Sequence, residues 1–249
     1  MKITAIKTPI IGIETASIEA LLAEALPKNL PEKSIVVISS KIIALCQGRT
    51  VALESISKEE LLQREADYYL PKEHRLHGTC TITHHAFIGS AGIDESNAAG
   101  QYVLLPENVQ AVAFDLQKFL VEKYNLQNVG VLITDSHSTL LRRGALGISL
   151  GYAGFSGLKD YRGTKDLFDR EMKMEIANHT DALAAAAVFA MGEGNEQTPL
   201  VLIENLPMHF SFEKSAPTPE ELETLFVNLE DDIFAPLIRT ELLRKGNGK

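Results

Sequence analysis

The chain has 249 residues, of which 45% are hydrophobic and 23% are charged, and this composition excludes a disordered or fibrous protein. Its 33 acidic and 24 basic residues give a net charge of −9, which opposes non-specific binding to nucleic acid. Two cysteines predict no disulfide framework, and the longest apolar run, residues 182–191, is too short to cross a bilayer. We expect a cytoplasmic globular protein that binds neither nucleic acid nor membrane.

Segments typical of strands and helices alternate along the whole sequence, which predicts a mixed α and β fold without internal repeats. Helical patterns cover residues 18–25, the segment from Ser39 and Ser40 to Gly48, residues 53–70, 109–124 and 178–191, and a further helix starts at Thr218. Runs rich in β-forming residues cover 35–38, 80–91 and 129–134. Six glycines between residues 144 and 163 favour turns and close backbone approach over helix, and residues 244–249 are expected to fray.

Residues 92–97, Gly-Ile-Asp-Glu-Ser-Asn, form a polar cluster that Gly100 closes. Asp94 and Asn97 offer a carboxylate and an amide oxygen, which suit a hard cation, and the backbone amides of such a turn suit an anion. Surface turns use the same residue types, because Asp and Asn bond to their own backbone. The pattern alone leaves both interpretations open.

A second polar cluster, Thr134-Asp135-Ser136-His137-Ser138, lies at the carboxyl end of the predicted strand 129–134. Asp135 and Ser136 suit Mg²⁺ or Mn²⁺, because such ions keep waters and take one or two carboxylates plus substrate phosphates. A turn or helix cap would use them equally well. His137 is either an acid or base near a phosphate or a solvent-facing turn residue. Asp94 and Asp135 are 41 residues apart, so only the fold can bring them together.

Several basic residues lie beside turns or glycines, namely Lys41, Arg49, Arg142, Arg143 and Arg162. Lys41 stands at a predicted helix start behind Ser39 and Ser40, where the ammonium and the helix amides can hold phosphate together. A guanidinium suits a carboxylate or a phosphate. For each of these side chains the alternative is simple exposure to solvent. The common nucleotide-binding and hydrolase motifs, including the P-loop, do not occur in the sequence.

Several short motifs stand in a fixed order over nearly the whole chain. They are Ser40-Lys41-Ile42, Gln47-Gly48-Arg49, residues 91–97, Leu104-Leu105-Pro106, Ile133-Thr134-Asp135-Ser136, Arg142-Arg143-Gly144, residues 158–163 and residues 191–194. In this order they resemble the coenzyme F420:L-glutamate ligases. The resemblance implies an α+β fold in two parts, unrelated to the P-loop, and an intertwined homodimer. It implies one domain over residues 1–249, or two interlocked subdomains of about 1–78 with 185–249, and 79–184.

The resemblance also implies an activity. A member of this family is a GTP- or ATP-dependent ligase that requires Mg²⁺ or Mn²⁺ and joins L-glutamate to a carboxylate through an acyl phosphate and then an amide. At matching positions, the metal ions would be held by Asp94, Asp135 and Ser136. Catalytic roles are expected for Lys41, His137 and Arg142. Contacts to the nucleotide are expected from Ser39, Ser40, Lys41, Asn97, Arg143 and Arg162.

The sequence departs from the usual family pattern beside this expected site. Leu45 and Gln47 replace one basic and one acidic residue, and His137-Ser138-Thr139 follows the metal-binding pair where an Asn-Gly-Arg or Phe-Gly-Arg is usual. These departures resemble a bacterial branch described as folate-metabolism γ-glutamate ligases, so F420-0 and a folate-like carboxylate are both candidate acceptors. Two other functions stay open: a non-catalytic nucleotide-binding module and a metal-dependent phosphohydrolase.

Overall fold

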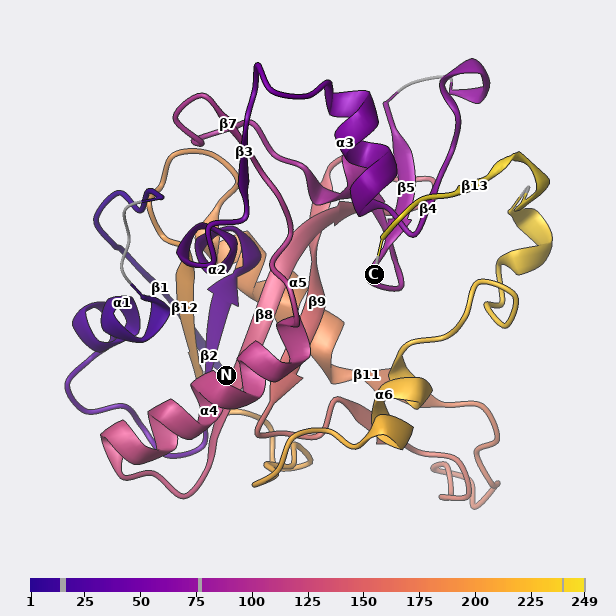
Figure 1. The fold of residues 1–249 in the computed structure, drawn as a ribbon. Helices are drawn as coiled ribbons and strands as arrows, with labels where there is room; N and C mark the ends of the chain where they lie inside the picture. Colours follow the sequence, from indigo (N-terminus) through magenta and orange to yellow (C-terminus); the bar gives the residue numbers. More distant parts are fainter. Residues whose placement is uncertain (14–16, 76–77, 239, 249) are drawn as a thin grey trace.

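The computed structural model describes residues 1–13, 17–75, 78–238 and 240–248. It has an α+β fold around a five-stranded sheet with the strand order β1-β12-β2-β8-β9 (Figure 1). These strands are β1 (Lys2–Ile6), β12 (Leu200–Glu204), β2 (Ser34–Ser39), β8 (Val129–Ser138) and β9 (Ala145–Ala153). Strands β2 and β8 run parallel, and the other neighbours run antiparallel.

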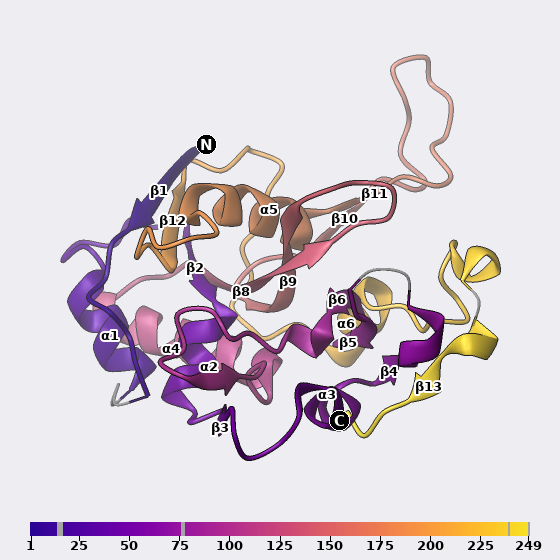
Figure 2. The same ribbon diagram turned by 90° about the horizontal axis from the view of Figure 1, so that it is seen from above.

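Helices cover both faces of this central sheet. One face packs against α1 (Ile18–Ala25), α2 (Ser40–Cys46) and α4 (Val109–Tyr124), and the other packs against α5 (His179–Met191). Figure 2 shows α4 and α5 on opposite sides of the sheet. In β2, Val36 and Ile38 face the first layer, while Ile35 and Val37 face α5. Because both faces are buried, β2 is apolar at successive positions instead of alternating.

Smaller elements surround the central sheet. A four-stranded sheet has the order β13-β4-β5-β6, and two short pairs are β3 with β7 and β10 with β11. These strands are β3 (Thr50–Ala52), β4 (Tyr68–Tyr69), β5 (Cys80–Thr83), β6 (Ala86–Gly89), β7 (Gln101–Val103), β10 (Leu158–Asp160), β11 (Ile176–Asn178) and β13 (Arg244–Lys245). The chain between β10 and β11 extends away from the body of the protein (Figure 2).

The remaining helical segments are short. They are α3 (Lys58–Glu65), α6 (Pro219–Leu225), η1 (Lys72–His74), η2 (Ser90–Gly92), η3 (Ala235–Leu237) and η4 (Thr240–Leu242). The predicted helix start at Thr218 is confirmed by a capping box in which Thr218 and Glu221 bond to each other's backbone amides. Among the described residues, no helix is both long and apolar enough to span a bilayer.

The predicted helix over residues 53–70 is much longer than the one observed. Helix α3 begins only after Ser57, whose side chain accepts a hydrogen bond from Glu60 N, and it ends before β4. The helix buries Leu61 and Leu62, so the core contact that stabilises it covers about one turn. The residues on either side of α3 instead pair with β7 and β5.

The glycine-rich stretch from residue 144 contains a long strand where turns were predicted. Gly147 and Gly151 lie within β9, and a Cβ atom on Gly147 would collide with the backbone of Ala184 in α5. On Gly151 it would lie 3.0 Å from the backbone of Val109 in α4. The predicted close backbone approach is therefore confirmed, because these glycines let two helices pack directly onto the strand.

The prediction that the C-terminal tail frays is wrong for the part that the structure describes. Strand β13 pairs with β4, and three further backbone amides of residues 246–248 bond to carbonyl groups of residues 63–67. Lys249 lies outside the described residues. The division into two subdomains stays a prediction.

Candidate functional site

A cavity of about 640 Å³ opens where the parallel pairing of β2 with β8 ends, at Ser39 and Thr134, while β8 itself continues to Ser138. Its lining includes six of the residues that the sequence predicts for the site: Ser39, Lys41, Asp94, Asn97, Asp135 and Ser136. The two acidic clusters, which are far apart in the sequence, therefore meet at one edge of the sheet. Open α/β sheets generally bind ligands at this edge, where neighbouring parallel strands end together.

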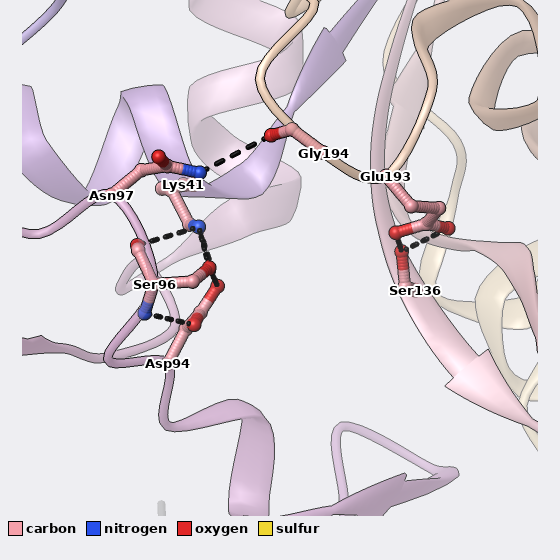
Figure 3. Close-up of polar contacts among 7 residues, drawn as sticks. All are labelled: Lys41, Asp94, Ser96, Asn97, Ser136, Glu193 and Gly194. Carbon is pink, nitrogen blue, oxygen red and sulfur yellow. Dashed lines mark hydrogen bonds and ion pairs between the residues drawn. The ribbon is translucent and has the colours of Figure 1, made fainter.

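The carboxylate of Asp94 accepts the hydrogen bonds that stabilise its own turn. Asp94 Oδ1 accepts from Ser96 N at 2.7 Å, and Asp94 Oδ2 accepts from Ser96 Oγ at 3.1 Å and pairs with the Lys41 ammonium (Figure 3). Desolvation raises the pKa of Asp94, but the hydrogen bonds from Lys41 and Ser96 outweigh it and hold the pKa below its ordinary value. Asp94 is therefore an ionised carboxylate at neutral pH.

A strained backbone segment precedes this turn. Ser90, Ala91 and Gly92 have successive φ values of 54°, 53° and 71°, and a residue other than glycine costs about 1–3 kcal/mol in such a conformation. Thr81 stabilises the segment, because its side-chain oxygen accepts from Ala91 N at 2.8 Å. The strain and the hydrogen bond together fix where the Asp94 turn begins.

Asp135 extends from β8 immediately after an irregularity in the pairing of β8 with β9. Burial and, to a smaller degree, the negative charge of Asp94 raise the pKa of its carboxyl, which reaches about 6. Hydrogen bonds from the Ser136 amide and the Ser40 hydroxyl, and the charge of Lys41, lower it in part. Asp94 and Asp135, the two predicted metal-binding acids, therefore lie close enough for the charge of Asp94 to raise the pKa of Asp135.

Ser39 and Ser40 behave differently from what a helix start predicts. Ser39 takes the N-cap position of α2 but makes no capping hydrogen bond with its side chain, and it lines the cavity. The buried hydroxyl of Ser40 is directed to Asp135. Helix α2 thus contributes Ser40 to the acidic site and Lys41 to the pair with Asp94.

The segment between α5 and β12 was not predicted as part of the site. Both carboxylate oxygens of Glu193 accept from Ser136 Oγ at 2.9 Å, and Gly194 O accepts from Asn97 Nδ2 at 3.2 Å (Figure 3). One segment therefore contacts both acidic clusters. The available signal was the Gly-Glu-Gly sequence at 192–194, which follows a helix and precedes a buried strand.

The cavity carries an excess of negative charge. Among the described residues that line it, four carboxylates face one ammonium group, that of Lys41; the acids are Asp94, Asp135, Glu193 and Glu196. All are hard oxygen donors of the type that Mg²⁺ and Mn²⁺ prefer. The donor set therefore fits such an ion, although the described residues contain no group of three His, Cys, Asp or Glu already gathered as ligands.

Five of the predicted residues are not among those that line the cavity, namely Ser40, His137, Arg142, Arg143 and Arg162. Arg142 and Arg143 lie in the exposed turn between β8 and β9, where Arg142 donates to Leu141 O. Arg162 is paired with Asp160 at 2.7 Å at the base of the extended segment between β10 and β11. His137 lies farther along β8, where desolvation lowers its pKa.

Leu45 and Gln47, two of the departures from the family pattern, have different surroundings. Leu45 lines the cavity and is buried. The side-chain amide of Gln47 instead accepts from Glu107 N at 2.9 Å and donates to Glu107 O at 3.1 Å, so it stabilises a loop. Arg49 pairs with Glu65 and Glu107 beside a second cavity of about 1200 Å³.

Comparisons with known proteins identify related sequences. The family model described as F420-0:Gamma-glutamyl ligase matches residues 5–205, a range that contains the whole lining of the smaller cavity. A coenzyme F420:L-glutamate ligase of Methanococcus maripaludis is 33% identical over 230 residues, which cover 83% of this chain and 91% of that protein. Another from Methanopyrus kandleri is 31% identical, with 75% of this chain and 79% of that protein covered. One from Methanocaldococcus jannaschii is 39% identical, with 52% of each chain covered.

Proposed function

Because this chain belongs to the F420-0:γ-glutamyl ligase family, we propose that it joins L-glutamate to a carboxylate acceptor in a reaction driven by GTP or ATP and a divalent ion. The observation that carries the proposal is the shared cavity of Asp94 and Asp135, with Lys41 between α2 and the Asp94 turn. Two carboxylates and a cation in one cavity support the proposal that a nucleoside triphosphate and a metal ion are held together there.

The proposed reaction has two steps. An oxygen of the acceptor carboxylate first attacks the γ-phosphorus, so that the nucleoside diphosphate leaves and an acyl phosphate forms. The amine of L-glutamate then attacks the acyl carbon, inorganic phosphate leaves, and the amine loses a proton as the amide forms. A bound Mg²⁺ or Mn²⁺ would neutralise phosphate oxygens during the transfer. Asp94, Asp135 and Ser136 are the residues that would hold it.

The charge of the cavity supports a requirement for metal ions. Four carboxylates against one ammonium would repel a triphosphate, so the nucleotide needs additional positive charge to bind there. Asp135 also faces the negative charge of Asp94, which adds to the effect of burial, the main cause of its raised pKa. A divalent ion between the acids and the phosphates would remove both repulsions.

The acceptor is proposed to be F420-0 or a folate-like molecule with a free carboxylate. The names of the related proteins favour F420-0, while Leu45 makes one wall of the cavity apolar where the family pattern has a charge. Comparing product formation with F420-0 and with a folate, each in the presence of L-glutamate, distinguishes the two acceptors.

We also propose a homodimer. Phe189 on α5 is 91% exposed, and Leu167 and Phe168 in the extended segment are 98% and 83% exposed, as expected for surfaces that a second copy covers. Arg142 and Arg143 lie outside their own chain's cavity, so a role for them at the substrate requires the turn that carries them to reach the cavity of the other copy. Light scattering coupled to gel filtration measures the oligomeric state.

The activity is tested by phosphate release from GTP or ATP. We expect release to require a divalent ion, L-glutamate and the acceptor, and to be lost in Asp94→Asn and in Asp135→Asn while circular dichroism shows that both variants fold. Glu95→Gln is the matched control, because Glu95 is next to Asp94 but pairs with Lys58 outside the cavity lining. This control should keep its activity.

The two alternative functions predict other results in the same assay. A phosphohydrolase would release phosphate without L-glutamate, and the release would still depend on Asp94 and Asp135. A nucleotide-binding module would bind GTP tightly and release no phosphate with any of a panel of carboxylates. Either result would exclude the proposed ligase reaction.

A further inference from the structure

Lys41 is bound to the same carboxylate that is proposed to hold a metal ion. Its ammonium pairs with Asp94 Oδ2 and donates to Ser96 O at 3.2 Å and to Ser96 Oγ at 3.3 Å (Figure 3). A lysine ammonium has three hydrogens, and all three have an acceptor in this turn. Lys41 is therefore held within the Asp94 turn.

The carboxylate of Asp94 is also largely occupied. Its Oδ2 atom accepts from both Lys41 and Ser96 Oγ, and its Oδ1 atom accepts from Ser96 N. Each carboxylate oxygen has about two lone-pair positions, so these bonds leave one position on Oδ1. A divalent ion there would lie beside a lysine ammonium, and like charges this close repel each other in a half-buried site.

The charges on the other side of the cavity explain why the lysine is held there. Asp135, Glu193 and Glu196 face the same space, and Lys41 is the one cation among the described lining residues. The ammonium therefore partly balances the negative charge of these acids. A ligand that brings its own cation makes this balance unnecessary, and a ligand that brings phosphates gives the ammonium a new acceptor.

We infer that Lys41 couples the binding of the metal ion to the binding of the nucleotide. It opposes a free divalent ion at Asp94, and it leaves Asp94 when a phosphate is present to accept its hydrogen bonds. The ion and the nucleotide then bind cooperatively, and each increases the affinity for the other by the same factor. This inference rests on the proposed function, because it takes Asp94 as a metal ligand and the cavity as a phosphate site.

The test is the affinity for Mn²⁺, measured from the electron paramagnetic resonance signal of free Mn²⁺ with and without a non-hydrolysable GTP analogue. In Lys41→Met, we expect Mn²⁺ alone to bind about tenfold more tightly than in the wild-type protein, because the repelling charge is gone. The increase in Mn²⁺ affinity that the nucleotide causes should fall by a similar factor. Lys41→Arg keeps the charge and should resemble the wild-type protein in binding Mn²⁺ alone.

Lys58→Met is the matched control. Lys58 pairs with Glu95 at 2.7 Å in the same turn, but neither residue lines the cavity, so its Mn²⁺ affinity should stay within about twofold of the wild-type value. Suppose that the wild-type protein binds Mn²⁺ with nucleotide, but that Lys41→Met binds Mn²⁺ alone no more tightly than the wild-type protein does. The coupling role of Lys41 is then wrong, and the proposed function stands. If no variant binds Mn²⁺ with or without nucleotide, the proposed function fails as well.

Discussion

Replacing Thr81 with valine removes the hydroxyl that holds the strained segment before Asp94. Thr81 Oγ1 accepts from Ala91 N at 2.8 Å and donates to Ile88 O. Valine fills nearly the same volume but leaves the buried Ala91 amide without its acceptor, which costs about 1–3 kcal/mol, and the lost bond to Ile88 O adds about 1 kcal/mol. We therefore expect Thr81→Val to lower the free energy of unfolding by about 2–4 kcal/mol.

Thr83 provides a matched control two residues along the same strand. It is 4% exposed and Thr81 is 1% exposed, but Thr83 Oγ1 has no hydrogen-bond partner among the residues that the structure describes. Thr83→Val removes a desolvated hydroxyl that makes no bond, so it should leave the free energy of unfolding unchanged or raise it by about 1 kcal/mol. The two substitutions are chemically identical, and they differ in the hydrogen bonds that each one removes.

Urea unfolding and thermal unfolding measure both variants. For a chain of this length, a loss of 2–4 kcal/mol corresponds to a fall in melting temperature of about 5–15 °C. Thr81→Ser keeps the hydroxyl and should recover most of the lost stability. Equal effects of Thr81→Val and Thr83→Val would refute the reasoning, because packing alone would then explain the stability of this strand.

Three further substitutions test the site and the sheet. Asp135→Asn should raise the free energy of unfolding at pH 7 by up to about 3 kcal/mol and leave it little changed near pH 4, because the pKa of Asp135 is raised to about 6 and the folded state resists its ionisation. Gly92→Ala should weaken Mn²⁺ binding and lower stability by about 2 kcal/mol, because the Leu105 side chain occupies the position of the new Cβ and φ is +71°. Gly147→Ala should lower the melting temperature by about 5 °C or more, because its Cβ would collide with α5.

Each of these predictions has its own check. The free energy of unfolding of the wild-type protein should fall relative to that of Asp135→Asn as the pH rises from about 4 to about 6. Urea unfolding of both proteins at several pH values measures this difference. The same pH dependence in both proteins would contradict the raised pKa of Asp135. Gly100→Ala also has a positive φ but meets open space, so it should keep its Mn²⁺ affinity. Gly12→Ala has neither restriction, and a melting temperature as low as that of Gly147→Ala would contradict the packing argument.

The elements that the sequence predicts well are those whose own residues determine them. Helices α1 and α4 follow the apolar spacing of their sequences. Helix α5 follows a run rich in alanine, and Gly192 ends it with a positive φ, as its position after the helix indicates. Strand β9 could not be predicted in the same way. Its glycines are required by the backbones of α4 and α5, and a contact between elements far apart in the chain leaves no local pattern.

The same distinction applies to the candidate site. Asp94 and Asp135 could be singled out because each stands in a polar cluster with a recognisable chemistry, and they do line one cavity. Arg142 and Arg143 have equally suitable chemistry, but they lie in the exposed turn between β8 and β9 and do not line that cavity. Residue type therefore indicates what a side chain can bind, whereas the length and direction of the strands decide where it is.

Strand direction also explains why Glu193 was missed. In β12 the first residue, Leu200, lies opposite Ile38 near the end of β2, because the two strands are antiparallel. The segment that precedes β12 therefore reaches the same edge as the segments that follow β2 and β8. Ser39 N donates to Pro199 O at 3.0 Å at this junction. A site at this edge of a mixed sheet includes residues that follow its parallel strands and residues that precede its antiparallel ones. A search limited to residues that follow predicted strands therefore finds Asp135 and omits the glutamate that contacts Ser136.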